Sequence, residues 1–257
     1  MTAMLLRVEQ LGMSFGGLKA VDDVDLAMSG GEITAIIGPN GAGKTTFFNL
    51  VSGFYAPTKG RIVLNGVDVA GLPAHRIARL GVARTFQTTR LFPEATVLDN
   101  VIVGRRQHTR SNVLDAILRT KRLRVEESEC REKAREALDF VGALPLEGSP
   151  VGSIPQEARK RVAIALALVT EPRLLLLDEP AAGINHEETG GLTDLIRKVV
   201  ESGVAVCLVE HKMRMVMDLS DRIVVLNHGK KIAEGTPQEI KQDPTVIEAY
   251  LGASGHA

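Results

Sequence analysis

The chain has 257 residues, of which 44% are apolar, and this composition argues against a disordered protein and allows a sizeable core. Its 31 basic and 31 acidic side chains give no net charge, so a nucleic-acid partner is not expected. The longest strongly apolar stretches, such as residues 162–169, are too short to cross a bilayer, and residues 1–9 do not resemble a signal peptide. Cys130 and Cys207 lie far apart and indicate no disulfide framework, which favours a reducing cytoplasm.

Two kinds of β-structure are predicted along the chain. Residues 1–30 and 60–69 alternate apolar and polar positions between turn signals such as Asn65-Gly66, which predicts an antiparallel β subdomain. Parallel strands buried on both faces are predicted by continuous apolar runs at residues 33–37, 174–177, 204–209 and 223–226. Helical patterns lie between these runs, at residues 44–52, 156–170, 187–201 and 214–219. This alternation predicts an α/β fold with a mainly parallel core sheet.

The middle of the chain has a different pattern. Amphipathic helices are predicted at residues 113–118 and 126–141, where apolar residues recur three or four positions apart. Basic residues between positions 105 and 124 precede a run of glutamates between positions 126 and 136. We therefore predict an inserted α-helical subdomain at residues 88–165. Residues 1–87 and 166–257 would form the core together with the β subdomain.

A phosphate-binding loop is predicted directly after the first buried strand. The sequence Gly38-Pro39-Asn40-Gly41-Ala42-Gly43-Lys44-Thr45 fits the pattern G-x-x-x-x-G-K-[ST], and a predicted helix follows it. Glycines let the backbone N–H groups curl around phosphate oxygens, and the helix adds the positive end of its dipole. Lys44 would then reach the β- and γ-phosphates of ATP, Thr45 would bind Mg²⁺, and Thr46 would complete the ATP site. The alternative interpretation is a glycine-rich turn that only links a strand to a helix.

Two carboxylates follow a second buried strand. Asp178 and Glu179 come directly after residues 174–177, and ligands of open α/β sheets bind at the carboxyl ends of strands. Asp178 is expected to hold Mg²⁺, directly or through water. Glu179 is expected to polarise the attacking water as a general base. An acidic loop or a helix cap is the alternative interpretation.

With these motifs in this order, nearly the whole chain resembles the nucleotide-binding subunit of ABC transporters. The resemblance implies that Phe15 stacks on adenine, although it would otherwise read as a core aromatic residue of an edge strand. It implies that Gln87 touches Mg²⁺ and relays the nucleotide state to membrane subunits, where an ordinary surface glutamine is the alternative. It also implies that His211 contacts the γ-phosphate and the attacking water, so that His211, Glu179 and Lys44 form the catalytic set. The alternative for His211 is a structural role. Residues 182–185 would communicate across a dimer.

Further stretches are similar to the branch of the family that serves branched-chain amino-acid transporters. They are residues 16–21, 181–185, 234–237 and 247–252. The long insert around residues 105–124 is also similar to that branch. Its basic face would lie near anionic lipid headgroups or form a solvated surface, and both interpretations stay open.

The second marker of the family, Leu-Ser-Gly-Gly-Gln at the start of a helix, is degenerate in this chain. Counting back from Asp178 places it at Ile154, Pro155, Gln156, Glu157 and Ala158, which keep neither the serine nor the glycines. Pro155 supplies neither a hydroxyl nor an N–H group. Glu157 would place an anion near a phosphate, at a cost on the order of 3 kcal/mol for each charge pair unless the side chain turns away. This departure predicts a heterodimer with a related ATPase subunit, in which the partner's site turns over poorly.

The favoured hypothesis is an ATP-hydrolysing subunit on the cytoplasmic, inner face of the cell membrane. It would power the import of branched-chain amino acids through transmembrane permease subunits, with a substrate-binding protein in the full system. One alternative is a nucleotide-binding regulatory subunit that does not hydrolyse ATP; the degenerate marker favours it, while Glu179 and His211 oppose it. The other is a soluble ABC-type ATPase acting on nucleic acid or ribosomes, which usually has a second cassette or a long coiled-coil insert.

Overall fold

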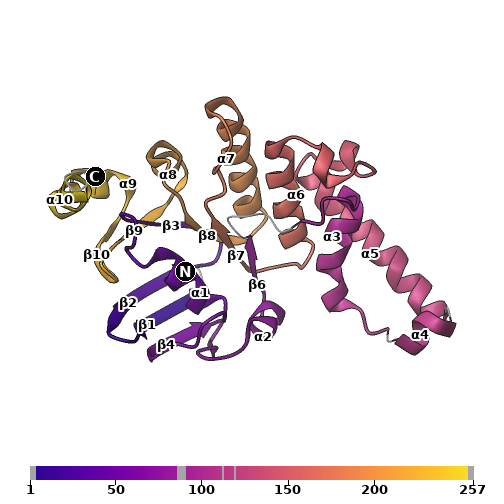
Figure 1. Ribbon diagram of the computed structural model, residues 1–257, viewed down its shortest axis with the longest axis horizontal. Helices are drawn as coiled ribbons and strands as arrows, with labels where there is room; N and C mark the ends of the chain where they lie inside the picture. The colour runs from indigo at the N-terminus through magenta and orange to yellow at the C-terminus, as the bar shows by residue number, and fades with distance from the viewer. Residues whose placement is uncertain (1–3, 86–90, 112, 119, 254–257) are drawn as a thin grey trace.

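The core of the protein is a six-stranded sheet with strand order β10-β9-β3-β8-β7-β6 (Figure 1). The computed structural model describes residues 4–85, 91–111, 113–118 and 120–253. All neighbouring strands are parallel except β9 and β10, which form an antiparallel hairpin at one edge. The strands are β3 (Ile33–Ile37), β6 (Val82–Thr85), β7 (Leu174–Asp178), β8 (Ala205–Val209), β9 (Arg222–Asn227) and β10 (Lys230–Gly235). The prediction of an α/β fold with a mainly parallel core sheet is therefore confirmed.

The central strands are buried on both faces. Every residue of β3, β7 and β8 is buried, as expected of continuous apolar runs in a parallel sheet. Alternate residues pack into two different apolar clusters: Leu175 and Leu177 join one, and Leu174 and Leu176 join the other. The sheet thus separates two apolar layers, and polar groups lie at the carboxyl ends of its strands.

One layer is an antiparallel β subdomain. Its strand order is β2-β1-β4-β5, formed by β1 (Met4–Phe15), β2 (Leu18–Ser29), β4 (Lys59–Leu64) and β5 (Val67–Asp68). Asn65 and Gly66 both have positive φ in the turn between β4 and β5, which suits a tight hairpin. Helix α1 (Lys44–Val51) lies between this sheet and the core sheet and buries Phe47 and Phe48 there. This confirms the predicted antiparallel subdomain.

Helices cover the other face and extend from one end of the molecule (Figure 1). Those beside β8, β9 and β10 are α7 (His186–Glu201), α8 (Met213–Leu219), α9 (Pro237–Gln242) and α10 (Pro244–Ala253). The extending arm contains α3 (Val97–Arg105), α4 (Val113–Leu118), α5 (Lys121–Phe140) and α6 (Gln156–Leu168), together with 3₁₀ turns at Arg106–His108, Leu144–Leu146 and Val151–Ser153. Helix α2 (Ala74–Arg79) precedes β6. Within the described ranges, no helix is long and apolar enough to cross a membrane.

Most predicted elements match the structure to within two residues, but some were missed. Helix α5 begins at Lys121, five positions before the predicted start, because the Thr120 side chain caps it by accepting a hydrogen bond from the Leu123 N–H at 3.3 Å. Strands β6 and β10 and helices α2, α3, α9 and α10 were not predicted. The predicted subdomain boundaries stay a prediction, since residue 88 lies outside the described residues and residue 165 lies within α6.

Candidate active site

A cleft of about 450 Å³ opens at the carboxyl ends of the core strands. It brings together Phe15, residues 40–46, Glu179 and His211, all of which the sequence had marked as candidates. It is also lined by Lys19 and His228, which had not been predicted. Gln87 lies outside the described residues.

The phosphate-binding loop has the backbone shape that its glycines allow. Gly38 and Gly43 have positive φ values of 150° and 100°. A Cβ atom at Gly38 would lie 2.0 Å from the carbonyl oxygen of Leu226, and one at Gly43 would lie 2.3 Å from that of Ala20. Any side chain at these positions would therefore force the loop apart. Helix α1 then starts at Lys44 with no side-chain cap, which leaves its first N–H groups to an anion.

Lys44 is held inside the loop. Its ammonium group donates to the carbonyl oxygens of Gly38 at 2.8 Å and Pro39 at 2.9 Å. Burial lowers the pKa of Lys44, while the charges of Glu179 and Asp178 act in the opposite direction. An ammonium group has three donors, so one is left for a phosphate oxygen. This geometry fits the predicted contact of Lys44 with ATP phosphates.

Asp178 is the last residue of β7, and Arg84 binds it from β6. The Asp178 Oδ2 atom accepts a hydrogen bond from Arg84 Nη2 at 2.9 Å, and both side chains are largely buried. Arg84 Nη1 also donates to Asn49 Oδ1 at 2.7 Å and to Ser52 Oγ at 3.1 Å, at the end of α1. The arginine thus joins β6, β7 and α1 in one network. The other carboxylate oxygen of Asp178 and the hydroxyl of Thr45, which is exposed in the cleft, are oxygen donors of the kind that Mg²⁺ prefers.

Glu179 and His211 face one another at the cleft. Glu179 Oε1 lies 2.9 Å from His211 Nε2. The backbone at Glu179 has a φ of +47°, and its N–H donates to the carbonyl oxygen of Val209 at 2.8 Å. This unusual backbone turns the chain sharply at the end of β7 and aims the carboxylate at the histidine. A carboxylate with an imidazole neighbour can orient a water molecule and accept its proton.

Glu210 is a buried carboxylate that sequence reasoning missed. It is only 3% exposed, and it accepts three backbone hydrogen bonds from two separate loops. Its Oε2 atom binds the N–H of Ala181 at 3.0 Å, and its Oε1 atom binds those of His211 at 2.8 Å and Lys212 at 3.1 Å. Lys212 Nζ adds a bond to the carbonyl oxygen of Ile184 at 2.8 Å. The loop after Glu179 and the segment that carries His211 are therefore fastened together.

Lys160 is a second buried charge that was not predicted. It lies on α6 and is 6% exposed. Within the described part of the chain, its ammonium group makes no hydrogen bond or ion pair. Burial lowers the pKa of Lys160, and the charges of Glu210, Glu179 and Asp178 oppose that effect. Because Arg159 and Arg161 flank it in the sequence, Lys160 looks there like part of an exposed, charged helix surface.

Phe15 ends strand β1 at the edge of the cleft. Its ring is partly exposed and packs edge-on against Tyr55, with 5.4 Å between ring centroids and an interplanar angle of 76°. Tyr55 holds the ring in place without covering all of it. An exposed aromatic face beside a phosphate-binding loop suits the predicted stacking on adenine.

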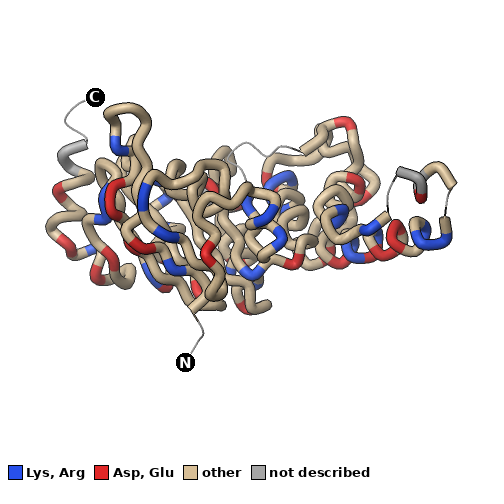
Figure 2. The backbone as a smooth tube through the Cα atoms, turned by 90° about the horizontal axis from the view of Figure 1, so that it is seen from below, with Lys and Arg blue, Asp and Glu red and all other residues tan. Residues whose placement is uncertain are grey.

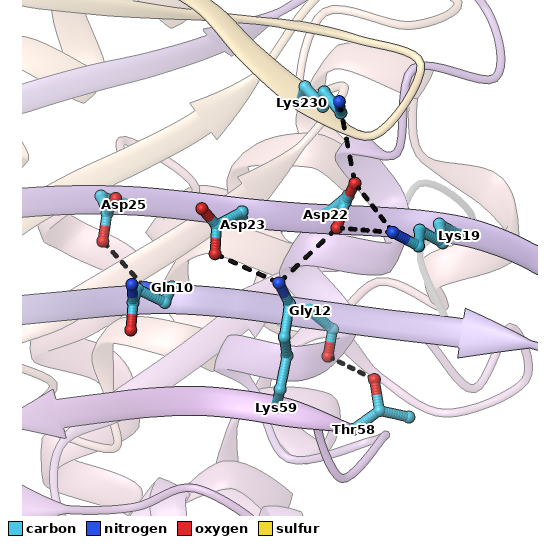
Figure 3. Close-up of polar contacts among 9 residues, drawn as sticks. All are labelled: Gln10, Gly12, Lys19, Asp22, Asp23, Asp25, Thr58, Lys59 and Lys230. Atoms are coloured by element: carbon cyan, nitrogen blue, oxygen red, sulfur yellow. Dashed lines mark hydrogen bonds and ion pairs between the residues drawn. The ribbon is translucent and has the colours of Figure 1, made fainter.

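A cluster of charges holds β2 against the β9–β10 hairpin, behind the phosphate-binding loop (Figure 3). The Asp22 carboxylate lies 3.4 Å from the Lys19 ammonium, 3.6 Å from that of Lys59 and 3.9 Å from that of Lys230. Burial would raise the pKa of Asp22, but the hydrogen bond from Lys19 and the charges of the three lysines together lower it. The Asp22 N–H donates to the carbonyl oxygen of Gly229 at 2.8 Å, and the Gly229 N–H donates to that of Ala42 at 3.1 Å. The cluster therefore supports the loop from outside.

The degenerate marker lies apart from this cleft. None of residues 154–158 lines it. Pro155 precedes α6 without a side-chain cap. The Glu157 side chain pairs with Arg161, which also donates to the carbonyl oxygen of Val141 at 3.0 Å. Glu157 thus pairs with Arg161, whereas the sequence had suggested only a turn of this side chain away from the phosphate.

Comparisons with known proteins agree with this geometry. Residues 21–182 match the family model described as ABC transporter, and residues 230–256 match the model described as branched-chain amino acid ATP-binding cassette transporter. The chain is 46% identical to the high-affinity branched-chain amino acid transport ATP-binding protein BraF of Pseudomonas aeruginosa, and 44% identical to LivG of Escherichia coli; each alignment covers 98% of this chain and 99% of the relative. A crystal structure of the ADP conformation of an ATP-binding cassette of an ABC transporter superimposes with a TM-score of 0.85 at 30% identity, over 98% of this chain and all of the other. The chain belongs to the ATP-binding cassette family of ABC transporter ATPases.

Proposed function

We propose that this protein is the ATP-hydrolysing subunit of a transporter that imports branched-chain amino acids through partner permease subunits. The observation that carries the proposal is the cleft in which Lys44, Glu179 and His211 meet. The substrate class is supported by the names of BraF and LivG, which are relatives over nearly their whole length. Binding to permease subunits would place the chain on the cytoplasmic, inner face of the membrane.

The residues of the cleft divide the work of hydrolysis. The loop N–H groups and Lys44 bind the phosphates and stabilise charge that develops on them. Glu179 accepts a proton from the attacking water, and His211 holds that water in line. Phe15 fixes the base of the nucleotide. The bound Mg²⁺ ion would neutralise phosphate charge, with Thr45 and Asp178 as its protein ligands and Gln87 as a further candidate.

The permease is proposed to dock at an apolar groove beside Arg84. The groove has a volume of about 330 Å³ and is lined by α2, β6 and α6, with Ala78, Ala163 and Leu166 among its residues. Phe54 also lines it and is 57% exposed, with the Arg84 guanidinium 5.8 Å from its ring centroid. Arg84 lines the groove and binds Asp178, so one side chain touches both the docking surface and the catalytic strand.

A heterodimer is favoured over a homodimer because of the marker. We propose that a related ATPase subunit supplies an intact marker to the cleft described above. Residues 154–158 would face that partner's nucleotide, and their lack of a serine hydroxyl and of glycines would slow hydrolysis there. A substrate-binding protein would complete the transporter. The rates of ATP turnover by this chain, by the partner and by their mixture test the asymmetry. Equal rates per chain in all three samples would contradict it.

The decisive experiment compares wild-type protein with Glu179→Gln in the assembled transporter. The substitution keeps shape and removes the base, so turnover should fall about 100-fold or more while ATP binding persists. Glu201→Gln, at the far end of α7, is the matched control and should leave turnover unchanged. Undiminished turnover in the Glu179→Gln assembly would favour the second candidate function, a regulatory subunit that binds nucleotide without hydrolysing it. The degenerate marker is the observation that keeps that candidate open.

A further inference from the structure

The end of the helical arm exposes two large apolar side chains. Ile117 and Leu118, in the last turn of α4, are 71% and 72% exposed, the highest values among the large apolar side chains of the described residues. A single exposed leucine needs no explanation, but two adjacent ones on a six-residue helix form a patch. We call this surface the arm tip and define it as Ile117, Leu118, Lys121, Arg124 and Val125.

The rest of the arm tip is basic. Lys121, Arg124 and Val125 are three and four positions apart, so they share one face of α5, and all three are exposed. Among the described residues, neither Lys121 nor Arg124 has an acidic partner. The nearest glutamate in sequence, Glu126, is already engaged: it pairs with Arg122 at 3.3 Å and accepts N–H groups of Arg110 and Ser111. The arm tip therefore combines apolar surface with two basic side chains, Lys121 and Arg124, that form no ion pair in the described part of the chain.

The arm tip lies toward the same edge of the molecule as α2, one of the elements that line the docking groove. The segment after α3 is fixed to the end of α6, since Arg105 Nη1 donates to the Val169 carbonyl oxygen at 3.3 Å and His108 Nε2 lies 3.2 Å from that of Thr170. Gln107, between them, lines the groove. Helix α2, which also lines the groove, and helix α4 both lie along the lower edge in Figure 1. Figure 2 shows the basic start of α5 at the opposite end of the molecule from the C-terminus.

We propose that the arm tip contacts the anionic lipid headgroups of the membrane beside the permease. The inference rests on the proposed function, because docking at the groove is what would bring the arm near the membrane. The occupant is chosen by charge complementarity. Unpaired basic side chains attract anionic lipids, and flanking aliphatic side chains enter the boundary between headgroups and acyl chains. The contact would fix the orientation of the arm, and with it that of α6, relative to the membrane plane.

The test measures binding of the purified full-length chain to lipid vesicles by co-flotation. One set of vesicles contains equal parts of phosphatidylglycerol and phosphatidylcholine, and the other contains phosphatidylcholine alone. Wild-type protein should bind the anionic set selectively and less tightly at higher salt. Lys121→Gln with Arg124→Gln should weaken that binding about 25-fold, or about fivefold for each basic residue. Ile117→Ser with Leu118→Ser should weaken it as well. Arg214→Gln with Lys241→Gln, two exposed basic residues elsewhere, is the charge-matched control.

The outcomes separate this proposal from the proposed function. Selective binding that is lost in both arm-tip variants and kept in the control supports the lipid contact. No selectivity for anionic vesicles, or an equal loss in the control, overturns it. Loss of permease assembly in detergent by the arm-tip variants, without any vesicle binding, would also overturn it and assign the surface to a protein contact. Vesicle binding needs no ATP hydrolysis, whereas the Glu179→Gln comparison needs no vesicle selectivity, so either result can fail alone.

Discussion

The catalytic cleft and the proposed degenerate marker differ in how many of their motif residues this chain keeps. In the cleft, Lys44, Glu179 and His211 are held by specific contacts, such as the hydrogen bonds that Lys44 donates to two carbonyl oxygens. At the proposed marker, residues 154–158 include no serine and no glycine, yet internal hydrogen bonds hold the start of the helix. Arg159 donates to the carbonyl oxygens of Ile154 at 3.1 Å and Gly152 at 2.7 Å, and Arg161 binds Glu157. A lost motif therefore need not be a lost structure, and the marker would still pack against a partner.

Substitution of Lys44 in the cleft should reduce turnover most. Lys44→Met removes the ammonium group that stabilises phosphate charge, so turnover of the assembled transporter should fall by about 100-fold to 1,000-fold. Steady-state ATPase assays measure it, with Lys241→Met as an exposed control. If turnover survives in Lys44→Met, the working site belongs to the partner, and the cleft is not the active half.

Substitution of Lys160 should reduce ATP turnover by a smaller factor. Lys160→Met keeps the length of the side chain and removes a buried charge that has no partner among the described residues. The ammonium group carries a desolvation cost of its own but also offsets the charges of Glu210, Glu179 and Asp178, so the melting temperature should change little. Turnover should fall about tenfold, because Asp178, Glu179 and Glu210 lose a nearby cation. Lys160→Arg should restore most of the activity. A fall in melting temperature together with full activity would show that Lys160 serves packing alone.

Repair of the proposed marker tests whether it limits hydrolysis at the partner's site. Pro155→Ser adds a hydroxyl and a backbone N–H group, and Gln156→Gly with Glu157→Gly removes two side chains that would keep a phosphate away from the backbone at the start of α6. The repair is made in the Glu179→Gln background, so that turnover reports only on the partner's site. Turnover should rise several-fold over Glu179→Gln alone. Pro155→Ser alone, which keeps the Glu157–Arg161 pair, should give part of the gain and guards against a folding defect. No gain from either variant would mean that this marker does not limit the partner.

The smallest effect concerns the support behind the loop. Because the pKa of Asp22 is lowered in the folded chain, its ionised form stabilises the fold above its usual pKa of 3.8, and this stabilisation is lost as the pH falls through the lower folded value. Asp22→Asn should therefore lower the melting temperature slightly at pH 7 and have little effect at a pH below the folded pKa of Asp22. Asp139→Asn, on the exposed side of α5, is the control. An equal effect of Asp22→Asn at both pH values would rule out the charge as the cause.

How much the sequence predicts depends on how local the determining pattern is. The buried strands β3, β7 and β8 were found because continuous apolar runs of this kind have few other interpretations. Strand β6 was missed because Val82–Thr85 is short and half polar, and β10 was missed because its sequence, Lys-Lys-Ile-Ala-Glu-Gly, looks like a charged loop. Both lie at sheet edges, where fewer side chains must be apolar.

The same limit applies to the site. The phosphate-binding loop was predicted because its residues are contiguous and its glycines are required by its own backbone. Arg84 was not assigned to Asp178 because 94 positions separate them, and only the pairing of β6 with β7 brings them together. Glu210 and Lys160 were overlooked for a related reason. Their importance comes from burial, and an isolated charged residue in a sequence is usually exposed.

The Glu210 carboxylate couples the movements of two loops of the cleft. It grips the loop after Glu179 with one oxygen and the His211 segment with the other, so neither can shift far without moving the other or breaking a buried bond. The two loops should therefore move together, because one carboxylate is hydrogen-bonded to both. If His211 contacts the γ-phosphate, as proposed, a change there would also move the loop at residues 181–185, which is proposed to face the partner subunit. The response to nucleotide and the signal to the partner subunit would then occur at the same time.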